Sequence, residues 1–203
     1  PRAAGETLDV LSVLRAAQAI AEPVEIREVL TRLLRVVLET AGAGSAVLAL
    51  AEADGLHVFA EASGAEAIVL DPPAPLASRN DIPSAIVLHV ARTHEPVLLA
   101  DASREGPFST DAAVRGFGKR SILCVPLIAQ GRLVGVLHLE NELIDAAFAP
   151  RRLELLRLLS GTCATAIVNA RLFDDLKGAR ARLEDHSRHL ERRVAERTSE
   201  LVE

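Results

Sequence analysis

The hydrophobic pattern divides the chain into helical ends and a strand-rich middle. Apolar residues recur at three- and four-residue steps over residues 7–21 and again over 26–41, and this spacing predicts two amphipathic helices. Gly42 directly follows the second stretch, in the position where many helices end. We therefore expect one helix over 7–21 and a second one that begins near Pro23 and stops at Gly42.

Two stretches with a turn at their centre predict β-hairpins. Residues 45–62 contain two short apolar runs on either side of an Asp-Gly pair, which is a strong hairpin signal. Residues 121–140 flank a Gln-Gly pair and are almost entirely apolar, which is typical of strands covered on both faces. The second hairpin is therefore expected at the centre of a sheet.

The segments between the hairpins are less regular. The proline-rich stretch 63–82 favours a loop with at most a short strand at 67–70. A short helix over 83–93 and a brief strand over 97–100 follow from their apolar spacing. Residues 101–119 contain several glycines and form no periodic pattern, so we expect a long loop there, and loops of that length are usually functional or disordered.

The C-terminal quarter predicts one very long helix. No proline occurs after Pro150, and a helix over 151–203 would measure about 80 Å at ~1.5 Å per residue. That length exceeds the diameter of a domain this size, so its far end must leave the body. Half of residues 174–203 are charged, and a lone helix of this polarity is marginal in water unless it pairs.

Two rows of heptad positions predict how this helix pairs. One row is Phe173, Arg180, Ser187, Val194 and Leu201, and the other is Leu176, Leu183, Leu190 and Arg197. Rows of this kind form the seam of a coiled coil, although a solvated surface helix is the alternative. With the first helix included, we expect a dimer seam made of Leu11, Leu14, Phe173, Leu176, Leu183, Leu190, Val194 and Leu201.

Composition narrows the class of protein. Apolar residues make up 49% of the 203 residues and the net charge is −5, which predicts a folded, aliphatic core and disfavours a nucleic-acid binder. No apolar run is long enough to cross a bilayer and no signal peptide is visible, so we expect a cytoplasmic protein without membrane contact. Cys124 and Cys163 are too few for a disulfide framework or a zinc site, and we expect reduced, inert thiols.

Several motifs resemble the GAF domains of bacterial multidomain sensor histidine kinases. The resemblance is strongest at SILCVPLIAQGRLVGVLHLEN (121–141) and AFAPRRLELLRLLSGTCATAIVNARLF (147–173), with support from EVLTRLLRVVLETAGA (28–43) and IVLHVARTHEPVLLADAS (86–103). LERRVAERTSEL (190–201) is similar to the coiled-coil linker that often leads from a sensor to the kinase region.

This resemblance implies an α+β fold with a central antiparallel sheet of five or six strands, flanked by helices and followed by a long C-terminal coiled-coil helix. It implies three parts: a dimerisation helix over 1–21, a GAF sensor domain over 22–173 and a signalling linker over 174–203. A homodimer through the terminal helices and a covalently linked output domain beyond residue 203 are the expected partners.

The resemblance also implies a ligand pocket under the 83–93 helix and the 101–119 loop. Its expected lining is Ile86, His89, Val90, Phe108, Phe117, Arg120, Cys124 and His138. Asp101, Ser103 and Arg120 could bind a polar ligand there, or they could cap turns and helix ends. The ligand is unknown, and no cofactor, metal or catalytic residue is predicted, because the cyclic-nucleotide, bilin and P-loop motifs do not occur and an axial haem histidine is not favoured.

The sequence therefore predicts a non-catalytic GAF module that senses a ligand or partner and transmits the signal through paired helices to a histidine kinase. One alternative is a regulatory ligand-binding GAF domain of another output enzyme, such as a diguanylate cyclase, phosphodiesterase or phosphatase. A second alternative is a GAF-type methionine-sulfoxide reductase, which the two isolated cysteines disfavour.

Overall fold

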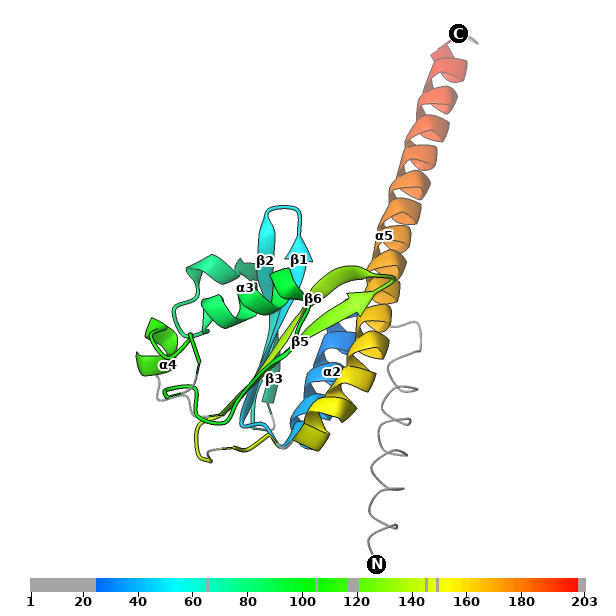
Figure 1. Ribbon diagram of the computed structural model, residues 1–203. Coiled ribbons are helices and arrows are strands. Elements are labelled where there is room, and N and C mark those ends of the chain that lie inside the picture. Colours follow the sequence, from blue (N-terminus) through cyan, green and yellow to red (C-terminus); the bar gives the residue numbers. More distant parts are fainter. Residues whose placement is uncertain are drawn as a thin grey trace, which may run out of the picture.

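The fold is a six-stranded antiparallel sheet with helices on both faces (Figure 1). The computed structural model describes residues 25–64, 66–104, 106–116, 121–144, 146–148 and 150–200, and within the last range the side chains are described for 152–193. Helices α2 (Ile26–Ala41) and α5 (Pro150–Glu200) cover one face, and α3 (Ser84–Thr93) lies on the other. This arrangement confirms the predicted α+β class with a long C-terminal helix.

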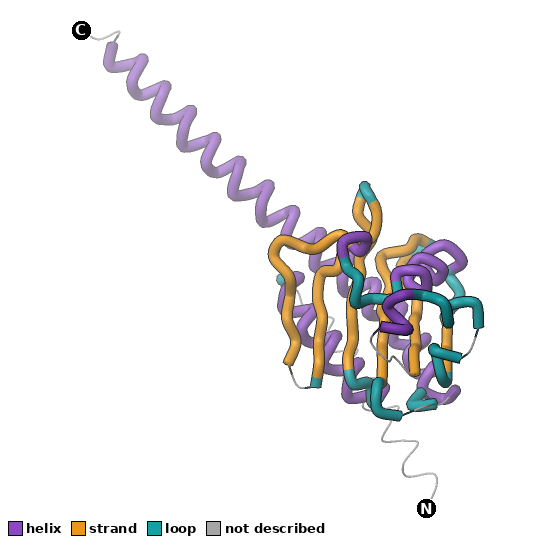
Figure 2. Tube along the Cα trace, turned by 90° about the vertical axis from the view of Figure 1, so that its left-hand side faces the viewer, coloured by secondary structure: helices purple, strands orange, loops and turns teal. Residues whose placement is uncertain are grey.

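The strands run in the order β3-β2-β1-β6-β5-β4, and Figure 2 shows them side by side. Their bounds are β1 Ser45–Glu52, β2 Gly55–Ser63, β3 Glu66–Pro75, β4 Val97–Leu99, β5 Ser121–Ala129 and β6 Arg132–Asn141. Both predicted hairpins, β1-β2 and β5-β6, are confirmed. Because β1 and β6 pair with each other, the two hairpins join into one sheet with β6 in its interior.

Two segments are more regular than their sequences suggest. Strand β3 spans ten residues, including Pro72, Pro73 and Pro75, where a loop with at most a short strand is expected. It is an edge strand that pairs only with β2 in the sheet order, and proline is tolerated there because an edge strand does not need every backbone N–H. In the loop after β4, the short helix α4 covers Ala112–Gly116.

Helix α2 ends where its sequence predicts. Gly42 adopts φ 64° and its N–H donates to the Leu38 carbonyl at 2.9 Å, which is the left-handed cap that glycine allows. The guanidinium of Arg152 on α5 lies against this cap and donates to the Ala41 carbonyl at 2.8 Å. The end of α2 is thereby attached to the start of α5. The helix predicted over 7–21 lies outside the described residues.

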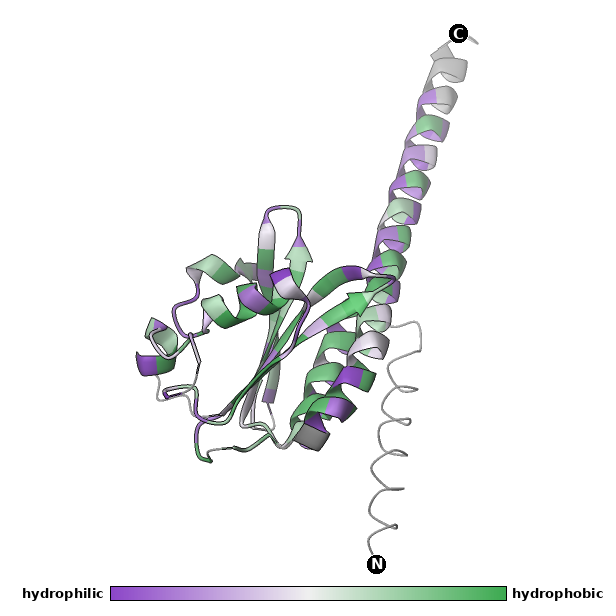
Figure 3. Ribbon diagram, viewed as in Figure 1, coloured by the Kyte–Doolittle hydropathy of each residue, from purple (hydrophilic) through white to green (hydrophobic). Residues whose placement is uncertain are grey.

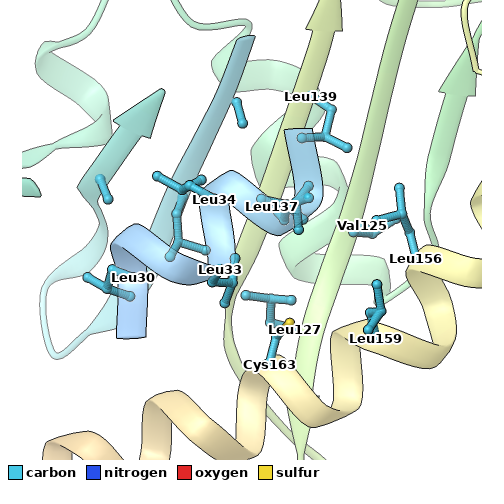
Figure 4. Packing of buried hydrophobic residues seen from close by; sticks show 14 of the residues in the cluster. Leu30, Leu33, Leu34, Val125, Leu127, Leu137, Leu139, Leu156, Leu159 and Cys163 are labelled. Carbon is cyan, nitrogen blue, oxygen red and sulfur yellow. The ribbon is translucent and has the colours of Figure 1, made fainter. Parts of the chain in front are cut away.

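The core consists of two apolar layers, one on each face of the sheet. Alternation along β5 and β6 sends one set of side chains toward α2 and α5 and the other set toward α3. Figure 4 shows the first layer, in which the buried residues include Leu30, Leu33, Leu34, Val125, Leu127, Leu137, Leu139, Leu156, Leu159 and Cys163. The second layer includes Ile86, Val87, Val90, Ile122, Cys124 and Val136.

Helix α5 is 51 residues long and leaves the body as a straight rod. Its first turns are buried against the sheet, and its outer part carries mixed polar and apolar residues (Figure 3). None of the helices in the described ranges is both long and apolar enough to span a membrane.

Three side chains hold α5 at the point where it leaves the body; we call Arg171, Asp174 and Lys177 the exit anchor. Arg171 forms an ion pair with Glu52 at 2.5 Å and its guanidinium lies 5.1 Å from the ring centroid of Phe59. Asp174 accepts a hydrogen bond from the Ile26 N–H at 3.3 Å, and Lys177 forms an ion pair with Glu25 at 2.6 Å. The anchor therefore joins α5 to the β1-β2 hairpin and to the N-terminus of α2.

Candidate functional site

A cavity of about 400 Å³ opens on the sheet face opposite α2 and α5, over β1, β2 and β3. Its remaining wall comes from the segment between β3 and α3 and from the end of β6. The lining residues are Ser45, Ala46, Val47, Glu61, Ala62, Ser63, Glu66, Ile68, Arg79, Asp81, Ile82, Glu140 and Glu142. The cavity is thus built from segments far apart in the sequence.

Strand register explains why polar and apolar residues meet there. Val47 of β1 lies opposite Glu61 of β2, and Glu61 in turn lies opposite Ile68 of β3, so all three side chains project from the same face. Helix α3 packs on β5 and β6, where Ile86 and Val90 fill the space. On the same side of the sheet, β1, β2 and β3 lie next to the area that α3 covers. The cavity forms over these three strands.

Among the described lining residues, the basic one is Arg79, and two carboxylates hold it. Its Nε and Nη2 donate to the two oxygens of Asp81 at 2.8 and 2.7 Å, and Nη2 also donates to Glu61 at 2.8 Å. The hydrogen bond with Asp81 is the main reason why the pKa of Arg79 is raised above its ordinary value. A bidentate pair of this kind fixes the guanidinium in position, so Arg79 joins β2 to the 79–82 segment.

A buried polar pair lies at the inner end of the cavity. Glu140 lines the cavity and is 4% exposed, and His138 next to it on β6 is 1% exposed. Their Oε1 and Nε2 atoms are 2.6 Å apart. The other imidazole nitrogen, Nδ1 of His138, has no hydrogen-bond partner among the described residues. Buried polar atoms are almost always paired, and exceptions often mark functional sites.

The described residues among those predicted to line the pocket are not part of the lining of this cavity. Ile86, Val90 and Cys124 are fully buried in the second core layer, and the rings of His89 and Phe108 meet edge-on with centroids 5.4 Å apart. His138 reaches the cavity only through Glu140. Phe117 and Arg120 lie outside the described residues. A direct ligand contact by any of these residues stays a prediction.

Asp101 and Ser103 follow the turn-capping alternative. The Oδ1 atom of Asp101 accepts hydrogen bonds from the Ser103 N–H at 3.0 Å and from the Ser103 hydroxyl at 2.5 Å. This is the local turn that an aspartate commonly stabilises. Neither side chain belongs to the cavity lining.

Both thiols are buried, on opposite sides of the sheet. Cys124 belongs to the layer under α3, and Cys163 belongs to the layer between the sheet and α5. Burial raises the pKa of the Cys163 thiol to about 12 and raises the pKa of Cys124 as well. Reactive cysteines require the thiolate form, so this placement favours the inert thiols that the sequence predicts.

Sequence reasoning missed most of the charged residues of the cavity. Glu61 lies in the middle of a strand, and nothing in its neighbourhood indicates a site. Arg79 and Asp81 stand in a short polar run after the proline-rich segment, which is the one local signal that could have drawn attention to them. Their approach to Glu61 and Glu140 depends on strand pairing that the sequence pattern does not specify.

Comparison with known proteins identifies the family. The sequence model described as "GAF domain" matches residues 25–167, which is most of the chain. The chain belongs to the GAF domain family.

Curated relatives of this GAF domain include histidine kinases. "Hybrid signal transduction histidine kinase G" from Dictyostelium discoideum is 39% identical over 88 residues, which cover 43% of this chain and 3% of that protein. "Peroxide stress-activated histidine kinase mak3" from Schizosaccharomyces pombe is 26% identical over 176 residues, or 86% of this chain and 7% of the kinase. The chain therefore spans only a small fraction of the length of these relatives.

Solved structures share the same GAF fold. The GAF domain of an Acinetobacter phosphoenolpyruvate-protein phosphotransferase gives a TM-score of 0.61 at 19% identity, covering 81% of this chain and 95% of that chain. Free methionine-R-sulfoxide reductase from Neisseria meningitidis also gives 0.61, at 17% identity, with 82% and 92% covered. At these identities the likeness extends to the fold alone.

The apolar positions of the predicted dimer seam are exposed on this GAF domain. Phe173 is 41% exposed, Leu176 and Leu183 are each 70% exposed, and Leu190 is 44% exposed. Leu11, Leu14 and Leu201, together with the side chain of Val194, lie outside the described part of the chain. The pairing of these positions with a second helix stays a prediction.

Proposed function

We propose that this GAF domain is the sensor and dimerisation module of a cytoplasmic signal-transduction histidine kinase. In this proposal a ligand or partner acts on the domain, and paired α5 helices carry the signal to an output domain. The observation that carries the proposal is the continuity of α5. One helix begins buried against the sheet and continues as a rod on which Leu176, Leu183 and Leu190 are exposed seven residues apart, with exposed Phe173 three residues before Leu176.

The physical argument for pairing is the cost of these exposed side chains. Burying a leucine fully contributes about 1.5–3 kcal/mol, and a highly charged helix gains little stability by itself in water. Leu176, Leu183 and Leu190 stand seven residues apart, as in the apolar rows of a coiled coil. A second copy of the chain offers the same row, so a symmetric homodimer buries both.

Transmission through α5 requires a mechanical link between rod and body. The exit anchor supplies it, because Arg171 attaches α5 to the β1-β2 hairpin that also forms the cavity wall. A ligand that prefers one arrangement of this hairpin would bias the direction or register of the rod. The bias is limited to the difference in the ligand's affinity for the two arrangements.

The two curated relatives described above support a kinase as the parent protein, since each is named a histidine kinase. A GAF-type reductase finds less support, because the two thiols of this chain lie on opposite sides of the sheet with raised pKa values. We therefore propose a regulatory role without catalysis for this part of the protein.

The seam can be tested by light scattering at several protein concentrations. The parent chain is expected to be a dimer at micromolar concentration, and Leu183→Glu is expected to weaken dimerisation at least roughly tenfold, because it places a charge in an apolar seam. Ala181→Glu adds the same charge off the seam and serves as the matched control. Circular dichroism of each variant confirms that the sheet domain stays folded.

A parent chain that is monomeric at high micromolar concentration would refute the proposal, and so would equal effects of the two glutamates. The orientation of the pair is read from two cysteine variants, Leu183→Cys and Leu190→Cys. Each forms a disulfide with its own copy when the helices are parallel and in register. An antiparallel pair cannot cross-link like positions at both sites, and it would point the two output domains in opposite directions.

A further inference from the structure

Helix α5 is apolar on two opposite faces where it lies on the body of the domain. Its outer face carries Leu158, which is 71% exposed, and Leu172, which is 60% exposed. A helix that covers a sheet usually has a polar outer face, so two exposed leucines on this face indicate a surface that another chain segment covers. The inner face of the same turns packs in the first core layer through Leu156, Leu159, Cys163, Ile167 and Ala170.

These leucines lie on the same line as the leucines of the rod. Leu158 stands 18 residues before Leu176, and Leu172 stands 18 residues before Leu190. Because 18 residues make about five turns at 3.6 residues per turn, such pairs lie above one another along a straight helix like α5. We call the residues on this line the outer stripe; they are Leu158, Thr165, Leu172, Leu176, Leu183 and Leu190.

The polar member of the outer stripe does not need water. The hydroxyl of Thr165 donates a hydrogen bond to the Gly161 carbonyl of the same helix at 2.9 Å. A hydroxyl that bonds to the backbone one turn earlier is satisfied within the helix, so Thr165 can enter a dry contact without leaving a donor unpaired. The outer stripe is therefore suited to apolar contact on the body as well as on the rod.

The length of the outer stripe favours a second copy of α5 as its partner. From Leu158 to Leu190 the helix rises about 48 Å at 1.5 Å per residue. The helix predicted over 7–21 would measure about 22 Å and would cover less than half of this line. A second α5 carries the same line over its whole length, and in a parallel pair in register each leucine meets its own copy.

We propose that the dimer interface extends onto the body: the outer stripe pairs with that of a second copy from Leu158 to Leu190, and the two sheet domains lie on opposite sides of the paired helices. This inference deepens the proposed function and rests on it for the second copy. It also gives the signal a shorter route. Leu156 and Leu159 pack against the sheet on the same turn that presents Leu158 to the partner, so a shift of α5 on the sheet changes the dimer contact directly.

Charge substitutions on the body test the inference. Leu158→Glu and Leu172→Glu are each expected to weaken dimerisation roughly tenfold, because each places two like charges in an apolar contact. Leu88→Glu is the matched control, since Leu88 is 54% exposed on α3, on the other face of the sheet, and it is expected to leave dimerisation unchanged. Light scattering at several concentrations measures association, and thermal unfolding measures folding. All three variants are expected to keep the unfolding midpoint of the parent, because the replaced leucines are exposed.

Unchanged dimerisation in both outer-stripe variants would overturn the inference. A lowered unfolding midpoint with unchanged dimerisation would assign the body part of the outer stripe to a contact within one chain, and it would overturn the inference as well. Leu158→Cys gives a second measurement, because a disulfide between the two copies requires their Cα atoms to lie within about 7 Å. The cross-link is expected for Leu158→Cys and not for Leu88→Cys, and its absence from an oxidised Leu158→Cys dimer would contradict the pairing.

The outcome separates from the test of the proposed function. A parent dimer that Leu183→Glu weakens and Leu158→Glu does not weaken contradicts only the extension onto the body. The reverse result contradicts the proposed pairing of the rods and leaves the contact on the body standing.

Discussion

Gly135 of β6 lies opposite Leu50 of β1, and at this position a single residue type is compatible with the pairing of the two strands. A Cβ atom at this position would lie 2.4 Å from the Ala49 carbonyl oxygen and 2.8 Å from Cδ2 of Leu50. The oxygen belongs to a paired strand and cannot move away without breaking the ladder. The glycine is therefore required by close approach of two backbones rather than by a turn.

Gly135→Ala is expected to lower the free energy of unfolding by about 1–3 kcal/mol, in the range of other overpacked cores. Gly161→Ala is the matched control, because a Cβ there meets nothing within 4 Å and the residue lies in a helix. It is expected to be neutral or to stabilise by up to about 1 kcal/mol. Urea unfolding followed by circular dichroism measures both, and equal losses would contradict the explanation.

At the scale of the element, α2 begins without a cap of its own. Glu25 makes no capping hydrogen bond through its side chain, and the first turn is instead held by Asp174 and Lys177 of α5. The hydrogen bond and charge of Lys177 lower the pKa of Glu25, and Glu25 raises the pKa of Lys177 in return. The first turn of α2 thus depends on the charge of Lys177 on α5.

The lowered pKa of Glu25 sets the sign of a pH dependence. A carboxyl group with a lowered pKa contributes stability above its ordinary pKa and loses that contribution as the pH falls through the lowered value. Hydrogen exchange of the Glu28 and Val29 amides, which donate to the Glu25 carbonyl, measures the first turn. Protection in the parent is expected to exceed that in Lys177→Gln by about twofold to threefold at pH 7, and the difference is expected to disappear as the pH falls below the lowered pKa of Glu25.

The stability that Lys177 gives to the first turn of α2 is lost at high pH. This loss occurs as the pH rises through the raised pKa of Lys177, which lies above 10.5. Arg182→Gln, one turn beyond the exit anchor, removes a positive charge from α5 without touching the Glu25 pair. It serves as the control. A ratio of protection factors between parent and Lys177→Gln that does not change with pH would contradict the ionic explanation.

At the scale of the whole molecule, α5 has one part that packs in the core and another part that extends away from it. Its first turns form part of the core, and Lys177 is its last residue with a hydrogen bond to another described element. Between Lys177 and residue 193, the hydrogen bonds of the described side chains join residues of α5 to one another. We therefore expect the sheet domain to fold without the part of α5 beyond Lys177.

A chain that ends after Lys177 is expected to keep the unfolding midpoint of the parent, because the core and the exit anchor remain. It is expected to lose dimerisation at least tenfold, because Leu183 and Leu190 are removed from the seam. Thermal unfolding and light scattering measure the two properties separately. A truncated chain that dimerises as strongly as the parent would place the interface on the body instead of the rod.

Much of the architecture is determined by the sequence itself, because it depends on local periodicity. The alternation in 45–62 and 121–140 predicts both hairpins, Gly42 predicts the end of α2, and the absence of proline after 150 predicts one long helix. Each of these signals acts within a few residues, where propensity and apolar spacing control the backbone. The family resemblance follows from the same segments.

Only the tertiary structure decided where the cavity lies and which charges surround it. Arg79 meets Glu61 because β3 folds back on β2, and Glu140 reaches Ser45 because two hairpins pair in one register. β3 also forms at an edge where its prolines are tolerated, which no local pattern indicates. Such contacts join distant segments, so they depend on the pairing of the whole sheet rather than on the residues beside them.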